Sequence, residues 1–329
     1  MEYFIAIDSG GSKCDSLLLS EDGTVHGFSR FEQNGISGRS EKAIIESVHS
    51  AMRNMVPEKI SVITYVEKYH PLFQHLGFRI FPNSTDSARQ RSIRMIITKE
   101  SYSELAICGL KSGIVLLSGT GAFVYARNND GKECHYDGLG PILGDDGSGY
   151  YIGLRAFRAA VRTHWHPRRE TVLRDKVFAH LGISAVWDAV RISLARHDRV
   201  VIASLAKVAI VEAEKGDKVA TAIIKEAAAA VCETVYDVIE ALGMTDGKYV
   251  LMGLGGVVTG SKIYWDEIAS NVRLMAPNIE CRIEKRPLVI GVAVSGMRDV
   301  LNLDESKTHE LADKVSRSYY EFIKNKETK

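Results

Sequence analysis

The chain has 329 residues, of which 45% are hydrophobic and 25% are charged, and these are the proportions of a folded globular protein. This composition excludes a disordered or fibrous chain, and the length predicts two domains of roughly 150 residues each. Lysine and arginine number 42 against 41 aspartates and glutamates, so the chain lacks the basic excess that binds a nucleic-acid backbone.

The sequence also bears on the compartment of the protein. No basic leader precedes Asp8, and no apolar run reaches the roughly 18 residues that span a bilayer. The five cysteines are scattered and never form a CxxC pair, which is typical of free thiols in a reducing compartment. We therefore predict a cytoplasmic protein without a membrane segment.

The first predicted elements are three strands in a meander. Their apolar runs lie at 4–7, 16–19 and 24–28, separated by a glycine-rich turn and then by an Asp-Gly turn. The same arrangement returns at 113–117, at 122–126 and in a strand through Cys134 and Tyr136. The unit is therefore duplicated.

In each copy the first turn combines glycine with hydroxyl side chains, at 8–12 and at 118–121. Glycine lets backbone N–H groups converge on an anion, and hydroxyls add donors, so each turn is a candidate phosphate cradle. The alternative is two tight hairpins without a ligand. Two copies heading the two halves of the chain favour a shared ligand.

Helical periodicity follows each meander, at 41–53 and 149–165, over most of 170–243 and at 311–323. A strand at 94–98 leads into a helix from about Ser101. A third glycine cluster, 253–256, follows a buried-type strand at 249–252. It lacks the third glycine of a dinucleotide fingerprint, because Val258 occupies that position.

The three glycine turns resemble the phosphate-1, phosphate-2 and adenosine motifs of the sugar kinase, actin and Hsp70 superfamily. They read DSGGSK at 8–13, LSGTGA at 117–122 and GLGG at 253–256. Residues 140–153 are similar to the G-x-x-x-G-D-x-G-S-x-x-x-x-G segment of the N-acetylglucosamine kinase and BadF/BadG-type ATPase family. Asn34 is similar to the family asparagine that contacts the sugar, and 287–293 resembles its closing P-x-x-G-A helix.

The resemblance implies an α/β fold of two ribonuclease-H-like domains, each with a mixed five-stranded sheet flanked by helices, and an ATP cleft between them. The predicted domains are residues 1–112 with about 295–329, and residues 113–294. The implied reaction transfers the γ-phosphoryl group of ATP, with Mg²⁺, to a hydroxyl of a small carbohydrate. A homodimer is expected, because dimers are common in similar kinases.

The same resemblance assigns expected roles to residues of this chain. Asp8 ends a strand and is the expected Mg²⁺ ligand, since Mg²⁺ keeps several waters and takes few carboxylates. The expected phosphate-binding residues are Gly10, Gly11, Ser12, Lys13, Gly119, Thr120 and Gly121; the adenosine-binding residues are Gly253, Gly255 and Gly256; and the sugar-binding residues are Asn34, Ser118 and Asp145.

The chain departs from the family pattern at the catalytic base. Family members carry an Asp in an N-D or T-D pair, and the matching position here is Glu100. Glu100 keeps a carboxylate on a longer arm, and such a base is worth roughly 10²–10⁴-fold in rate. The alternative is that an acid near a helix N-terminus is simply favourable there.

A second departure lies at 62–68, where the family usually has a small-residue G-x-A-G turn. Tyr65, Glu67 and Lys68 stand there instead and would reshape the acceptor pocket, although Lys68 is equally read as a solvated loop residue. The acceptor therefore stays open among an amino sugar such as N-acetylglucosamine, a hexose, and a sugar acid such as 2-keto-3-deoxygluconate.

Two other functions remain as alternatives. One is an activator ATPase that drives electrons from an iron–sulfur cluster into a dehydratase, which requires cysteine thiolates at a dimer interface. Gly121 stands in the region where such activators carry Cys, and Cys134 has no obvious partner. The other is a nucleotide sensor without turnover, which the changed base would suit.

Overall fold

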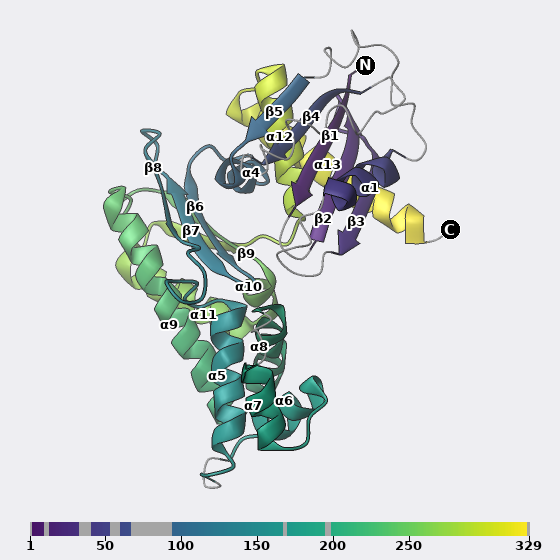
Figure 1. The fold of residues 1–329 in the computed structure, drawn as a ribbon. Helices are drawn as coiled ribbons and strands as arrows, with labels where there is room; N and C mark the ends of the chain where they lie inside the picture. The colour runs from purple at the N-terminus through teal and green to yellow at the C-terminus, as the bar shows by residue number, and fades with distance from the viewer. Residues whose placement is uncertain are drawn as a thin grey trace. The chain divides into compact units, whose positions relative to one another are not determined.

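The computed structural model describes residues 2–9, 13–32, 41–52, 60–66, 94–166, 170–194 and 199–327. The chain forms two compact units, Met1–Lys111 with Arg286–Lys329, and Ser112–Lys285. Each unit contains one five-stranded sheet with helices packed on it (Figure 1). The predicted α/β fold with two mixed five-stranded sheets is confirmed.

The sheet of the first unit is a meander extended by two parallel strands. Strands β1 to β3 pair antiparallel, β4 pairs parallel with β1, and β5 pairs parallel with β4, in the order β3-β2-β1-β4-β5. Because β1, β4 and β5 are parallel, their carboxyl ends meet at one edge of the sheet. The strands are β1 (Tyr3–Ser9), β2 (Lys13–Ser20), β3 (Val25–Glu32), β4 (Ile60–Val66) and β5 (Arg94–Thr98).

Helices cover both faces of this sheet. On one face, α1 (Glu41–Ala51) is joined to β2 by a hydrogen bond between the hydroxyls of Ser47 and Ser16, 2.8 Å apart. Ser16 is paired with Ile7 of β1, whereas Thr64 of β4 is in register with Ala6. Because neighbouring residues of a strand point to opposite faces of the sheet, Ser16 and Thr64 lie on opposite faces. Gly296 of α12 (Leu288–Leu301) lies against Thr64, so α12 covers the other face. The unit also contains α4 (Glu100–Ala106) and the C-terminal α13 (Glu305–Glu327).

The second unit repeats the same topology. Its meander of β6, β7 and β8 is antiparallel, β9 pairs parallel with β6 and β10 with β9, and the order is β10-β9-β6-β7-β8. The duplication seen in the sequence thus extends beyond the meander to two further parallel strands. The strands are β6 (Gly113–Ser118), β7 (Ala122–Arg127), β8 (Glu133–Asp137), β9 (Tyr249–Leu254) and β10 (Ile279–Ile283).

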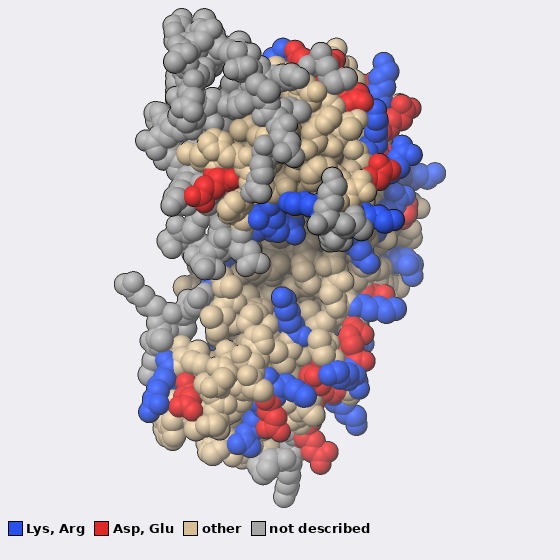
Figure 2. All heavy atoms as spheres, turned by 90° about the vertical axis from the view of Figure 1, so that its right-hand side faces the viewer, with Lys and Arg blue, Asp and Glu red and all other residues tan. Residues whose placement is uncertain are grey.

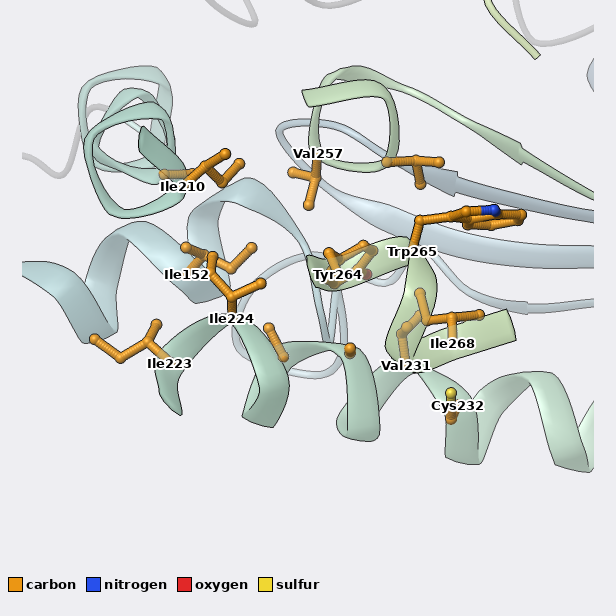
Figure 3. Packing of buried hydrophobic residues seen from close by; sticks show 14 of the residues in the cluster. Ile152, Ile210, Ile223, Ile224, Val231, Cys232, Val257, Tyr264, Trp265 and Ile268 are labelled. Atoms are coloured by element: carbon orange, nitrogen blue, oxygen red, sulfur yellow. The ribbon is translucent and has the colours of Figure 1, made fainter. Parts of the chain in front are cut away.

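The helices of the second unit surround a large apolar core. Side chains from several of them converge in Figure 3, where Tyr264 lies among isoleucine and valine side chains. Tyr264 is fully buried, and its burial keeps the phenol neutral by raising its pKa. The helices are α5 (Gly149–Arg162), α6 (Leu173–Leu181), α7 (Val186–Leu194), α8 (Arg199–Glu214), α9 (Lys218–Ala241), α10 (Gly256–Gly260) and α11 (Lys262–Met275).

The surface carries charges of both signs. Figure 2 shows one face of the molecule, on which basic and acidic side chains alternate around uncharged areas, as the near-neutral composition requires. In the described part of the chain, no helix is both long and apolar enough to cross a bilayer.

Helices α5 and α8 touch through a glycine of α5. A Cβ atom on Gly153 would overlap the backbone carbonyl oxygen of Ile202, and one on Gly149 would lie 3.5 Å from the carbonyl of Ala203. The missing side chain of Gly153 therefore sets how closely α8 approaches α5, whereas a Cβ on Gly149 would make an ordinary van der Waals contact with α8. This contact fixes the first turn of α8, which begins at Arg199.

Gly153→Ala should destabilise the second unit, because the new methyl group forces apart two helices whose backbones are in contact. We expect a loss of about 1–3 kcal/mol in the free energy of unfolding, measured by urea denaturation. Gly260→Ala is the matched control, since nothing lies within 4 Å of its Cβ position. Equal stability of the two variants would contradict the close contact.

Candidate functional site

The turn between β6 and β7 is tied by its carbonyl groups to the start of α5. The Gly119 carbonyl accepts from the amide of Gly149 at 2.7 Å, and the Thr120 carbonyl accepts from that of Tyr150 at 3.2 Å. In a trans peptide the C=O and the following N–H point in opposite directions, and no peptide bond of the described chain is cis. The N–H groups of Thr120 and Gly121 are therefore directed away from α5.

The first amides of α5 are satisfied within the protein. Besides the two bonds to the turn, the amide of Tyr151 donates to the Ser148 hydroxyl at 3.2 Å, which makes Ser148 the N-cap. The donors that usually remain unpaired at a helix start are thus paired. The amides left to bind an anion here are those of the turn, Thr120 and Gly121.

The segment before α5 is held in an unusual backbone conformation by Asp137, the last residue of β8. Its carboxylate accepts from the amides of Asp145 at 2.6 Å and Asp146 at 3.1 Å. Asp145 has a positive φ of 60°, which is rare for a residue other than glycine and marks a constrained position. A Cβ on Gly144 would overlap the Asp137 carboxylate, so glycine is required there.

This conformation brings the Asp145 carboxylate against the turn. Oδ1 accepts from the amide of Ala122 at 3.2 Å, and Oδ2 pairs with the Arg199 guanidinium of α8. Asp145 is 2% exposed. Burial raises its pKa above the ordinary value, whereas the charge of Arg199 and the Ala122 hydrogen bond oppose that rise. A buried carboxylate thus lies beside the directed amides.

The third glycine turn packs directly on the second. A Cβ on Gly255, whose φ is +94°, would overlap the carbonyl oxygen of Ser118, so only glycine allows the end of β9 to approach the end of β6. Among the described residues, no atom lies within 4 Å of a Cβ position on Gly119 or Gly256. These two glycines leave the backbone approachable, whereas Gly253 is covered by the Trp265 ring.

In the first unit the predicted metal ligand lies at the carboxyl end of β1. Asp8 is 7% exposed and is directly opposite Asp15 on β2. The carboxylate of Asp15 accepts two hydrogen bonds of 2.7 Å from the Arg30 guanidinium, and Lys13 lies 3.5 Å from it. The hydrogen bonds that Arg30 donates to Asp15 raise the pKa of Arg30. Arg30 thus neutralises the second of two adjacent acids.

Glu100 begins α4 two residues after the end of β5. It is therefore at the same sheet edge as Asp8, and the two parent strands are separated by β4, which is roughly 10 Å at the usual strand spacing. The structure describes the backbone of Glu100 and not its side chain. The predicted helix start near Ser101 agrees with α4.

The structure describes some of the other predicted residues and leaves others outside the described ranges. Ser118 is buried and its hydroxyl donates to the Gly147 carbonyl at 3.0 Å, so it shapes the turn. Tyr65 is a core residue of β4, with 1% exposure; the segment expected to be a changed turn is a strand up to Val66. Gly10, Gly11, Ser12, Asn34, Glu67 and Lys68 lie outside the described residues.

Sequence reasoning missed three residues of this site. Asp137 follows the strand predicted through Cys134 and Tyr136, Arg199 lies in a run interpreted only as helical, and Tyr264 lies in a helix that periodicity did not single out. The Tyr264 hydroxyl donates to the Gly147 carbonyl at 2.8 Å. Arg199 lies 54 residues from Asp145, and Tyr264 lies 117 residues from Gly147. No local sequence pattern can therefore indicate these pairs.

Two units of one topology, each with a glycine-rich sequence between its first two strands, define a protein of the sugar kinase, actin and Hsp70 class. The model of the BadF/BadG/BcrA/BcrD ATPase family matches residues 5–285. The chain belongs to this family.

Relatives and solved structures agree with this assignment. The chain is 28% identical over 310 residues to an N-acetylmuramic acid/N-acetylglucosamine kinase of Clostridium acetobutylicum, covering 89% of this chain and 98% of the relative. It is 29% identical to an N-acetyl-D-glucosamine kinase of Dictyostelium discoideum, over 85% of this chain and 92% of that protein. A solved candidate N-acetylglucosamine kinase of Chromobacterium violaceum has a TM-score of 0.68 at 20% identity, with 90% and 99% of the two chains covered.

The Gly147 carbonyl supplies a direct test of how the turn is held, because it accepts hydrogen bonds from two buried hydroxyls. Ser118→Ala and Tyr264→Phe should each lower the free energy of unfolding by about 1 kcal/mol. The double variant should lose more than the sum, since a buried acceptor then has neither donor.

The measurement is a double-mutant cycle by urea unfolding, with Tyr320→Phe as the control for a half-exposed tyrosine. Additivity within about 0.3 kcal/mol would show that the two hydroxyls act independently.

Proposed function

We propose that this protein is an ATP-dependent kinase that transfers a phosphoryl group to a hydroxyl of an amino sugar, with N-acetylglucosamine and N-acetylmuramic acid as the first acceptors to test. The observation that carries the proposal is the turn at Gly119–Gly121. The N–H groups of Thr120 and Gly121 point away from α5 and suit a phosphate. The buried Asp145 carboxylate beside them suits a sugar hydroxyl, from which it would accept a hydrogen bond. The named relatives support this acceptor class.

In the proposed reaction the acceptor hydroxyl oxygen forms a bond to the γ-phosphorus, and the bond from that phosphorus to the ADP oxygen breaks. The hydroxyl proton passes to a base, for which we propose Glu100. Its place at the carboxyl edge of the first-unit sheet supports this role. Since little covalent chemistry falls to the protein, catalysis of this kind is mainly positioning and charge stabilisation.

The phosphates are proposed to bind the amides of Thr120 and Gly121 in one glycine turn. In the other glycine turn, the proposed phosphate-binding residues are Gly10, Gly11, Ser12 and Lys13. Gly255 and Gly256 are proposed to receive adenosine, because Gly256 leaves open space where a side chain would stand. Gly253 acts indirectly, by admitting Trp265. Asp145 and Asn34 are proposed to bind the sugar, and Ser118 to hold the turn.

Asp8 fits Mg²⁺ by the chemistry of its donors. It offers hard carboxylate oxygens at a strand end, and the neighbouring acid, Asp15, is already paired with Arg30. Bound Mg²⁺ would neutralise charge on the nucleotide phosphates. Asp8 would hold the ion directly or through water.

The proposal is tested by acceptor-dependent release of ADP. Purified protein with ATP and Mg²⁺ should release ADP faster when an N-acetylated amino sugar is added than with hexoses or keto-deoxy sugar acids. A coupled assay over these three groups measures the preference. Preference for a sugar acid would retain the kinase and change the acceptor class.

Tight ATP binding by calorimetry without turnover on any acceptor would favour the sensor function. A brown, iron-containing protein would favour the activator. The structure makes the activator function unexpected, because Gly121 stands in the region where activators carry Cys, and a side chain there would meet the Asp145 carboxylate at 2.8 Å.

Glu100→Gln should lower kcat by roughly 10²–10⁴-fold and leave the KM for ATP within about twofold, because the variant removes the proton acceptor and keeps the shape. Steady-state kinetics at saturating acceptor measures both. Glu305→Gln is the matched control, since Glu305 is also an acid in the first turn of a helix of the same unit. Equal kcat in both variants would assign Glu100 only a helix-terminus role.

A further inference from the structure

The Asp145 carboxylate has one charged partner that no motif identifies. Arg199, the first residue of α8, lies 54 positions further along the chain and pairs with Oδ2 of Asp145. The guanidinium also packs on the turn itself, since a Cβ on Gly121 would be 2.5 Å from Nη2 of Arg199. A single arginine therefore contacts both the buried acid and the turn.

Stability alone does not explain this arginine. Its Nε is buried without a hydrogen-bond partner among the described residues, and a buried donor without an acceptor costs free energy. The Arg199 side chain as a whole is 32% exposed. The close contact of α8 with Gly153 fixes where the side chain begins. The arrangement suits a residue placed for its effect on Asp145.

The charges around Asp145 define what Arg199 does. Among the described residues, two charged groups act on this carboxylate: Arg199 from α8, which favours the anion, and Asp137 from the end of β8, which opposes it. Burial opposes the anion more strongly than either. Asp137 cannot move away, because it holds the amides of Asp145 and Asp146. Arg199 is the one cation in this set.

We propose that Arg199 is a positioning residue of the acceptor site, which keeps the buried Asp145 carboxylate anionic and directed at the turn so that it can accept a hydrogen bond from the sugar. This inference rests on the proposed function of Asp145. Arg199 acts on the acceptor through Asp145, with which it is paired. Without it, Asp145 takes up a proton at higher pH and then offers a donor where the sugar hydroxyl needs an acceptor.

The test compares Arg199→Gln with Arg199→Lys. The glutamine removes the charge and keeps hydrogen-bonding capacity, whereas the lysine keeps the charge. The first readout is the pH titration of Asp145 by carbon NMR of selectively labelled aspartate carboxyls, assigned with Asp145→Asn. The pKa of Asp145 should rise by about 1–3 units in the glutamine variant and stay near the wild-type value in the lysine variant.

The second readout is kinetic. In Arg199→Gln the acid limb of kcat/KM for the acceptor should move to higher pH by the same amount, and near that limb the KM for the acceptor should rise about tenfold or more. The KM for ATP should change less than twofold. Arg191→Gln is the control, because Arg191 pairs with Asp188 on the exposed surface.

The outcomes separate this inference from the proposed function. An unchanged titration of Asp145 in Arg199→Gln overturns the inference, as does an equal rise of KM for ATP and acceptor, which would assign Arg199 to the nucleotide. If the wild-type protein phosphorylates no sugar, the kinase proposal fails, while the titration still decides whether Arg199 controls Asp145. Should the glutamine variant not fold, Arg199→Met and the lysine variant provide the same comparison.

Discussion

The second unit is organised by the two hydrogen bonds that the Gly119 and Thr120 carbonyls accept from the start of α5. They pair the first helical amides and, through the geometry of the trans peptide, direct the next two amides the other way. The residues around the turn keep these two hydrogen bonds in place. Gly149 and Gly255 lack side chains where these would overlap or crowd the turn, and the Gly147 carbonyl is held by two buried hydroxyls.

The duplicated topology carries different chemistry in its two copies. At the end of β1 the first unit places a carboxylate, Asp8, whereas the end of β6 carries the hydroxyl of Ser118, which is used inside the protein. The shared scaffold supplies the parallel strand ends and the glycine turns. The side chains at those ends then differ: a carboxylate lies at the end of β1 and a hydroxyl at the end of β6.

Much of the fold was predictable because its signals are local. The meanders, α5, α9 and α13 follow from apolar periodicity and Asp-Gly turns, and the resemblance supplied the fold class, which is confirmed. Strands β4 and β10 were not predicted. The first was interpreted as an altered family turn, and β10 is a short edge strand with mostly solvent-facing, partly charged residues, which lacks a clear alternation.

The site was predictable only where a motif carried it. Asp145 was singled out by its place in the family segment, but the sequence did not show that it is buried with a positive φ. Both properties depend on Asp137, which binds its amide, and on Arg199, which neutralises it. Such partners meet only after α8 packs on α5, so no local pattern reveals them. The predicted phosphate, adenosine and sugar ligands stay predictions.

A common constraint links the buried acids of the two units. Asp15 is paired with Arg30 and Asp145 with Arg199, since a buried carboxylate without a partner is costly. Each arginine is therefore committed to an acid and adds little net positive charge at its turn. With 42 lysines and arginines against 41 aspartates and glutamates, the net charge creates no strong overall field that attracts an anion. The proposed affinity for a phosphate therefore rests on backbone N–H groups, on Lys13 and on a bound cation, and not on an overall positive charge of the protein.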